Sequence, residues 1–158
     1  DRSRFLGISG RSRKIQISLA AEKGIKDYPC PAGGCLLTDK NFSDRIRDYF
    51  SHTEHPFIKD ILLLKVGRHF RIDSANKVIV ARNEHECKVL KKQYHEKDHL
   101  LAPLNFHGPV VILQGSSLKA AIDKMVRYTK RYAPEAARIT HSFKGKTKIL
   151  SIKDFIVN

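Results

Sequence analysis

The stretch LLLKVGRHFRIDSANKVIVA, residues 62–81, decides the fold. It contains two strand-like runs rich in apolar residues, which lie on either side of the turn-forming residues Asp73-Ser74-Ala75-Asn76. Such an arrangement is typical of a β-hairpin. We therefore predict two paired strands, Leu62–Ile72 and Lys77–Ala81.

Two more pairs of short apolar runs predict further strands. The first pair is His99–Leu104 and Pro109–Leu113. The second pair, Ala137–Phe143 and Thr147–Ile152, turns at residues 144–146, Lys-Gly-Lys. With the opening hairpin these runs predict a small sheet built from hairpins.

Helices are predicted where apolar residues recur every three or four positions. A short helix begins near Ile15 and stops at Gly24, a residue common at helix ends. After an irregular loop over residues 24–38, Thr38 or Asp39 caps a second helix that Pro56 ends. The apolar face of this second helix consists of Phe42, Ile46, Tyr49 and Phe50.

Two further helices alternate with the predicted strands. Asn83 and Glu86 have the spacing of a capping box, which predicts a helix through about Tyr94. Ser116 or Ser117 caps the clearest helix of the chain. The apolar positions of this last helix are Leu118, Ala121, Ile122, Met125, Thr129 and Tyr132. The predicted class is α+β: a small mixed sheet of antiparallel hairpins with packed helices, preceded by a helix-loop-helix linker segment.

The charge of the chain indicates a polyanionic partner. Thirty Lys and Arg against sixteen Asp and Glu give a net charge of +14, and nucleic acid is the commonest partner of such a surface. The alternatives are a ribosome-associated protein and a merely basic one. The chain has no Trp, one Met and no long apolar window, so we expect no membrane association. Three cysteines, an odd and low number, indicate a reducing cytoplasm.

Basic residues gather in the hairpin stretch and in the last third of the chain. Strand alternation puts Arg68 and Phe70 on the face opposite to His69 and Arg71. If the final hairpin packs beside the last helix, one face carries a dense positive field suited to phosphates. We predict that Phe70, Tyr128 and Tyr132 pack in the core and do not stack on bases. The candidate RNA-binding residues are Arg68, Arg71, Arg82, Asn83, Lys119, Arg127, Lys130, Arg131, Lys144 and Lys146.

The cysteines leave two readings open. Cys30 and Cys35 lack a standard zinc spacing, and although His52 and His55 could complete a mixed site, we predict no metal. Cys35 is either a reactive thiol in a basic, glycine-rich loop or a small buried apolar residue. Cys87, on the inward side of its helix, is predicted to be core. No nucleotide-binding motif of the Ser-Gly-Gly-x-Asp-Ser type occurs, so we expect no cofactor in this chain.

Two segments resemble known families. The run GRSRK at residues 10–14, the run GIKDYPCPAGGCLLTD at residues 24–39 and the Phe42-Ser43-x-Arg45 segment resemble bacterial PP-loop proteins related to the thiouridine synthases ThiI and MnmA. The runs at 66–71 and 78–86 resemble the NFACT-R RNA-binding domain that is fused to these enzymes. The resemblance implies a parent that adenylates a tRNA uridine with ATP and Mg²⁺ in an upstream domain and then transfers sulfur from a cysteine persulfide.

The resemblance also sets the expected domains and function. Residues 1–37 would be the tail of the PP-loop domain, 38–60 a linking helix and 61–158 the RNA-binding domain. The chain starts at Asp1 without an initiator Met, and we expect a fragment that docks tRNA but is inactive alone. One alternative is a sulfur relay on Cys35, with Cys30 as resolving thiol and a cysteine desulfurase or other sulfur donor as partner. A second alternative is a ribosome-associated RNA-binding module.

Overall fold

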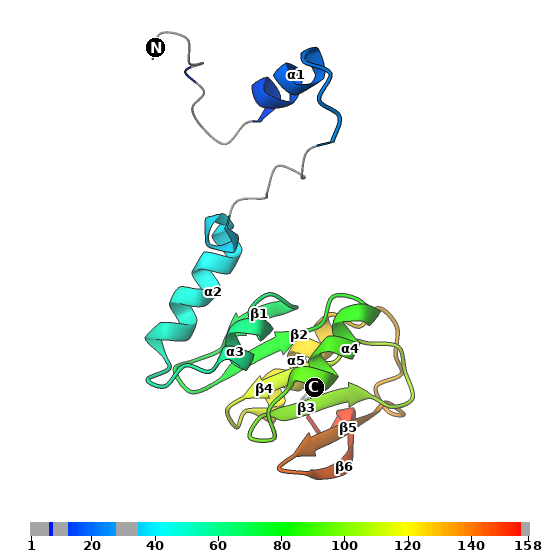
Figure 1. Ribbon diagram of the computed structural model, residues 1–158. Coiled ribbons are helices and arrows are strands. Elements are labelled where there is room, and N and C mark those ends of the chain that lie inside the picture. Colours follow the sequence, from blue (N-terminus) through cyan, green and yellow to red (C-terminus); the bar gives the residue numbers. More distant parts are fainter. Residues whose placement is uncertain (1–6, 8–12, 28–34, 156–158) are drawn as a thin grey trace. The chain divides into compact units, whose positions relative to one another are not determined.

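The computed structural model describes residues 7, 13–27 and 35–155, which belong to two compact units, Asp1–Asp39 and Lys40–Asn158 (Figure 1). In the first unit, α1 (Lys14–Glu22) confirms the predicted first helix, and Gly24 follows it with a φ of +66°. No residue of α1 is buried. A short 3-10 turn, Leu36–Thr38, closes this unit. Residues 28–34 of the predicted loop, Cys30 among them, lie outside the described residues.

The second unit is a six-stranded sheet with helices on both faces (Figure 1). Its strand order is β1-β2-β4-β3-β5-β6, and every pairing is antiparallel. The predicted α+β class is confirmed. In chain order the elements are α2 (Lys40–Ser51), α3 (Ile58–Leu63), β1 (Arg68–Arg71), β2 (Lys77–Val80), α4 (Glu84–Gln93), β3 (His99–Pro103), β4 (Val111–Gln114), α5 (Leu118–Arg127), β5 (Arg138–Phe143), β6 (Lys146–Ser151) and a 3-10 turn (Ile152–Asp154).

The alternation of side chains along β2 divides the apolar core in two. Val78 and Val80 join the cluster that contains Ile122 of α5, whereas Ile79 joins the cluster that contains Leu90 of α4. Each fully buried side chain of this size contributes roughly 1.5–3 kcal/mol relative to an exposed one. Both faces of the sheet are therefore covered, α5 lying on one side and α3 with α4 on the other.

The β1–β2 turn is held by side chains and also fixes the start of α5. The Asp73 carboxylate accepts hydrogen bonds from the backbone N–H groups of Ala75 and Asn76, both at 2.8 Å. The Asn76 side-chain oxygen accepts from the N–H groups of Ser116 and Ser117, at 2.8 and 2.9 Å. Ser117 is the N-cap residue of α5, but its own side chain makes no capping bond. The hairpin turn thus holds the two residues that lead into α5.

The structure corrects the boundaries of two predicted elements. The apolar run at 61–64 continues helix α3 and does not form a strand, and β1 begins only at Arg68. In the helical form, Leu63 packs under the sheet and Leu64, the residue that ends α3, packs against α2. Helix α5 ends at Arg127, five residues before Tyr132.

Helix α2 is tied to the sheet through Asp48. Its carboxylate accepts two hydrogen bonds from Arg71, at 2.8 and 2.9 Å, and one from Lys77 at 2.9 Å. The side chain of Lys77 is only 3% exposed. The Arg71 hydrogen bond, with further help from Lys77, holds the pKa of the Asp48 carboxyl well below its ordinary value. The predicted linking helix is therefore packed onto the sheet by a partly buried charge network.

Candidate nucleic-acid interface

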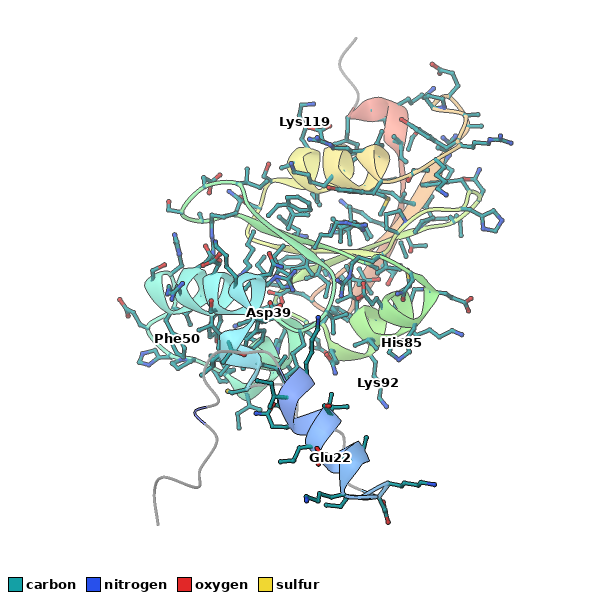
Figure 2. All side chains as sticks on the ribbon, turned by 90° about the horizontal axis from the view of Figure 1, so that it is seen from above. Glu22, Asp39, Phe50, His85, Lys92 and Lys119 are labelled. Carbon is teal, nitrogen blue, oxygen red and sulfur yellow. The ribbon has the colours of Figure 1, made fainter. Side chains whose placement is uncertain are left out.

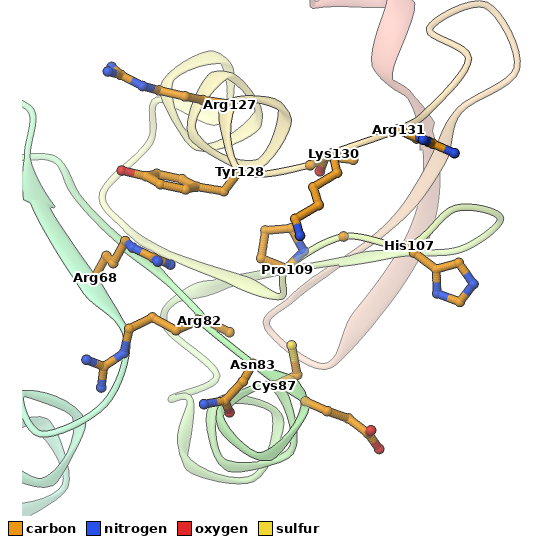
Figure 3. A pocket seen from close by; sticks show the side chains of 14 residues that line it. Arg68, Arg82, Asn83, Cys87, His107, Pro109, Arg127, Tyr128, Lys130 and Arg131 are labelled. Atoms are coloured by element: carbon orange, nitrogen blue, oxygen red, sulfur yellow. The ribbon is translucent and has the colours of Figure 1, made fainter.

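A groove of about 1150 Å³ opens at the end of the sheet where β1 begins and β2 ends (Figure 3). Four segments from different parts of the sequence converge on it: the start of β1, the start of α4, the β3–β4 loop and the end of α5. The groove is lined by Arg68, Ala81, Arg82, Asn83, Glu84, Cys87, His107, Gly108, Pro109, Arg127, Tyr128, Thr129, Lys130 and Arg131.

The first wall is the N-terminus of α4, where the predicted capping box is confirmed in part. The Asn83 side-chain oxygen accepts a hydrogen bond from the Glu86 N–H at 2.9 Å. The Glu86 carboxylate does not return to Asn83 but accepts from the backbone N–H of Arg82 at 2.7 Å. The same carboxylate accepts from the Arg82 guanidinium at 2.8 and 2.5 Å.

These contacts neutralise Arg82. Burial alone would raise the pKa of the Glu86 carboxyl, but the hydrogen bonds from the side chain and backbone of Arg82 outweigh burial and lower it. The Arg82 side chain remains about half exposed. The Arg82 guanidinium is therefore accessible to a ligand, but its positive charge is partly neutralised by Glu86.

The second wall is the end of α5. Thr129 donates its hydroxyl to the Met125 carbonyl at 2.9 Å, and the N–H groups of Tyr128 and Thr129 bond the carbonyls of Met125 and Val126. These bonds satisfy the last carbonyl groups and close the helix. Pro134 also disfavours helical backbone in the residue before it. The chain then turns so that Lys130 and Arg131 join the groove lining (Figure 3).

Aromatic and basic side chains stack between β1 and α5. The Arg68 guanidinium carbon lies 4.7 Å from the centre of the Tyr128 ring, and the Lys124 amine lies 4.7 Å from that of Phe70. The two rings stack with centres 5.8 Å apart. Each cation–π contact contributes roughly 0.5–1 kcal/mol at an exposed site. This stack holds Arg68 in a fixed place at the mouth of the groove.

The β3–β4 loop completes the lining through Gly108. A Cβ atom at this position would lie 2.8 Å from the Thr129 hydroxyl oxygen and 2.9 Å from the Phe106 ring. Only a residue without a side chain lets the loop approach the end of α5 so closely. The loop thereby places His107 and Pro109 at the groove.

The groove has a strong positive charge. Its lining contains five Lys and Arg side chains and one acid, Glu84. In the described part of the chain, none of four basic groove residues makes an ion pair with an acid. Three of these are exposed and the fourth, Arg68, is half-buried. The four are Arg68, Arg127, Lys130 and Arg131.

The structure brings together six of the ten residues that the sequence marks as RNA-binding candidates. These six are Arg68, Arg82, Asn83, Arg127, Lys130 and Arg131.

The other four candidates lie elsewhere. Arg71 is on the opposite face of β1, where Asp48 holds it. Lys119 is in the first turn of α5, where it donates to the Phe155 carbonyl at 3.2 Å (Figure 2). Lys144 and Lys146 lie in the β5–β6 hairpin, at the sheet edge opposite to β1. The final hairpin therefore adds nothing to the groove lining.

The aromatic prediction agrees with the packing. Phe70, Tyr128 and Tyr132 are partly buried against the α5-side core. Among the cysteines, Cys35 is exposed, and Cys87 packs against the α4-side core while also lining the groove. The described residues contain no group of three or more side chains suited to hold a metal ion.

Sequence reasoning missed the β3–β4 loop. The available signal is the Gly108-Pro109 pair, which marks a turn between two predicted strands. The turn could be predicted from that pair, but the contact of Gly108 with Thr129 could not, because the two residues are twenty-one positions apart and meet only in the folded chain. His107 and Pro109 therefore emerge as groove residues only in the structure.

A comparison with known protein families covers the groove residues. The family described as NFACT protein RNA binding domain matches residues 67–155, more than half of the chain. Every residue of the groove lining falls inside this match. No match was found among curated proteins or among solved structures. Within the described residues, none of the helices has the length and apolar character needed to cross a membrane.

Proposed function

The chain belongs to the family of NFACT protein RNA binding domains, and from this premise we propose that the basic groove is its RNA-binding site. The observation that carries the proposal is the convergence of Arg68, Arg127, Lys130 and Arg131, none of which has an acidic partner in the described structure. Each segment that supplies them lies inside the family match. Unpaired cations in a groove attract phosphate groups and release counterions when RNA binds.

The RNA proposed is tRNA, and the role proposed is to dock tRNA for an ATP-dependent, sulfur-modifying domain in the cytoplasm. Support for this finer proposal comes from the sequence, through the resemblance of residues 10–45 to PP-loop proteins of the thiouridine synthase group. The groove itself supports a polyanion with a phosphate backbone. ATP and Mg²⁺ would then belong to the sulfur-modifying domain.

The thiol of Cys87 offers a direct test of the groove because it is part of the lining. In a Cys30→Ser/Cys35→Ser variant, Cys87 is the remaining cysteine. We expect tRNA to slow its alkylation by a small maleimide, with the protection following the binding curve. Unchanged alkylation at saturating tRNA would place the binding site elsewhere on the protein.

A matched pair of variants shows whether the groove cations matter beyond their charge. Arg127→Ala/Lys130→Ala removes two charges from the groove, and Lys91→Ala/Lys92→Ala removes two exposed charges from the far end of α4. We expect only the first variant to lose most of its tRNA affinity. Equal losses would indicate that net charge alone attracts the RNA.

A sulfur relay on Cys35 is a second candidate, since the structure places this thiol on the surface. Incubation of the chain with a cysteine desulfurase and cysteine would then add one sulfur atom, about 32 Da, to Cys35. Absence of this adduct by mass spectrometry rejects the relay. Cys30, the proposed resolving thiol, lies outside the described residues.

The identity of co-purified RNA separates tRNA docking from a ribosome-associated role. We expect tRNA to be enriched over ribosomal RNA when the chain is isolated from cells after mild crosslinking. Enrichment of ribosomal RNA would favour the ribosome-associated alternative while leaving the groove as the RNA site.

A further inference from the structure

The rings near the groove carry an inference that rests on the proposed RNA-binding function and goes beyond it. Proteins that bind single-stranded RNA offer open aromatic faces on which bases stack. Proteins that bind base-paired RNA contact phosphates and 2′-hydroxyl groups, because the bases are stacked inside the helix. The two modes therefore differ in what the protein must leave exposed.

The aromatic side chains that reach the groove are already occupied. The Tyr128 ring carries the Arg68 guanidinium at 4.7 Å and stacks with Phe70 at 5.8 Å. Next to the lining, Phe106 pairs with Tyr132, their ring centres 5.9 Å apart, and both pack against the core. A base could stack on Tyr128 only by displacing Arg68 or separating the two rings.

The large exposed rings of the described chain lie away from the groove. Phe50 and Phe57, both about half exposed, belong to α2 and to the segment before α3, and neither lines the groove. Phe143 stacks on His99 in the strands beyond β4, with ring centres 3.9 Å apart. The one exposed ring among the groove residues is the imidazole of His107.

The polar groups of the groove suit a sugar–phosphate backbone. Figure 3 shows Arg127 and Lys130 on one side of the groove, with Arg82 and Asn83 on the other. Asn83 uses its side-chain oxygen for the helix cap, and in the described structure its NH₂ group has no partner, so it can donate to a 2′-hydroxyl or phosphate oxygen. Cations on two facing walls can contact phosphates on both sides of a backbone that lies between them.

We propose that the groove binds the backbone of base-paired RNA, a stem, in preference to a single strand. Arg68 is central to this preference. Stacked flat on Tyr128, it covers the ring that a base would need, and the N–H edge of its guanidinium remains available for phosphate. The same contact thus removes a stacking surface and presents a phosphate donor.

Binding to two fluorescent RNA probes tests this proposal with the full chain. One probe is a hairpin with a stem of about 16 base pairs, the length that duplex-RNA domains span, and the other is a strand of equal length that cannot pair. We expect the stem to bind at least ~10-fold more tightly, and a scrambled stem sequence to change the affinity by less than ~3-fold, since phosphates carry no sequence information.

Two variants identify the groups responsible. Arg127→Ala/Lys130→Ala should weaken stem binding strongly, whereas His107→Ala, which removes the one exposed ring of the groove lining, should weaken it far less. A loss from His107→Ala as large as the loss from the double variant would show that a ring contact dominates, and would overturn the proposal.

The outcome of the probe comparison also separates this proposal from the function on which it rests. If the single strand binds as tightly as the stem and still protects Cys87 from alkylation, the groove binds RNA but the preference for stems is wrong. If neither probe binds, the RNA-binding site itself is wrong.

Discussion

Replacing Arg127 and Lys130 with alanine should flatten the salt dependence of RNA binding by an amount that follows from the structure. Four groove cations have no acidic partner in the described residues, and each is expected to neutralise one phosphate. With about 0.9 units of slope for each neutralised duplex phosphate, log K should fall with log salt at a slope of about −3.6. A rise from about 50 to 200 mM salt then weakens binding by about 150-fold.

The double variant retains two of the four cations, so its slope should be about −1.8 and the same rise in salt should weaken binding by only about 12-fold. The two proteins differ most at low salt. Fluorescence anisotropy over a series of salt concentrations measures both slopes directly.

Lys91→Ala/Lys92→Ala is the control for net charge and should keep the slope of the unmodified chain. Because Arg127 lies in the last turn of α5, its loss also removes a favourable helix-dipole interaction, so thermal denaturation must first show that the variant is folded. A folded double variant with an unchanged slope would refute the assignment of phosphates to these residues.

Four further predictions concern the charge networks and the β3–β4 loop. Asp48→Ala leaves the buried Lys77 without its carboxylate and should lower the free energy of unfolding by about 3 kcal/mol, measured in urea; a change below about 1 kcal/mol would contradict the network. The pKa values of the Asp48 and Glu86 carboxyl groups are lowered on folding. Their contribution to the free energy of unfolding is therefore present above the ordinary carboxyl pKa and is lost as the pH falls through the folded values. Thermal stability should drop below about pH 4, and it should drop less steeply in Asp48→Asn. Glu86→Gln frees the charge of Arg82 and should raise RNA affinity about two- to fivefold, with the slope steeper by up to one phosphate; weaker binding by the folded variant would argue against Arg82 as a contact. Gly108→Ala should force the loop away from α5 and reduce RNA affinity with little change in salt slope, whereas a steeply altered slope would show that phosphate contacts had changed instead.

The sequence predicts those parts of the fold whose signals are local. The signals for the Asp73-to-Asn76 turn and for the Asn83 cap each lie within a few residues along the chain, and the structure contains both features. The run at 61–64 is apolar at every position, and such a run does not distinguish a helix from a strand. Its helical form, in which Leu63 and Leu64 are buried in different clusters, is visible only in the folded chain.

The sequence predicts which basic residues are candidates for RNA binding, but it does not predict where they lie in the fold. Strand alternation correctly puts Arg68 and Arg71 on opposite faces of β1. Only the fold shows that Arg71 is bound by Asp48, which lies twenty-three residues earlier in the chain. Similarly, nothing near Lys144 in the sequence indicates that its hairpin lies at the sheet edge opposite to β1. The sequence therefore does not show which of the ten candidates lie together, and the fold brings six of them to one groove.

The distribution of acids supports a binding role for the groove over a role in folding. Two cations with clear structural roles are each paired with a carboxylate: Lys77 with Asp48, and Arg82 with Glu86. The unpaired groove cations bring like charges near one another, which destabilises the free domain, and in the described structure no acid forms an ion pair with any of them. Stability alone gives no reason for Arg127 and the residues beside it to converge with Arg68. A bound polyanion gives such a reason, because its phosphate groups attract the cations and offset their mutual repulsion.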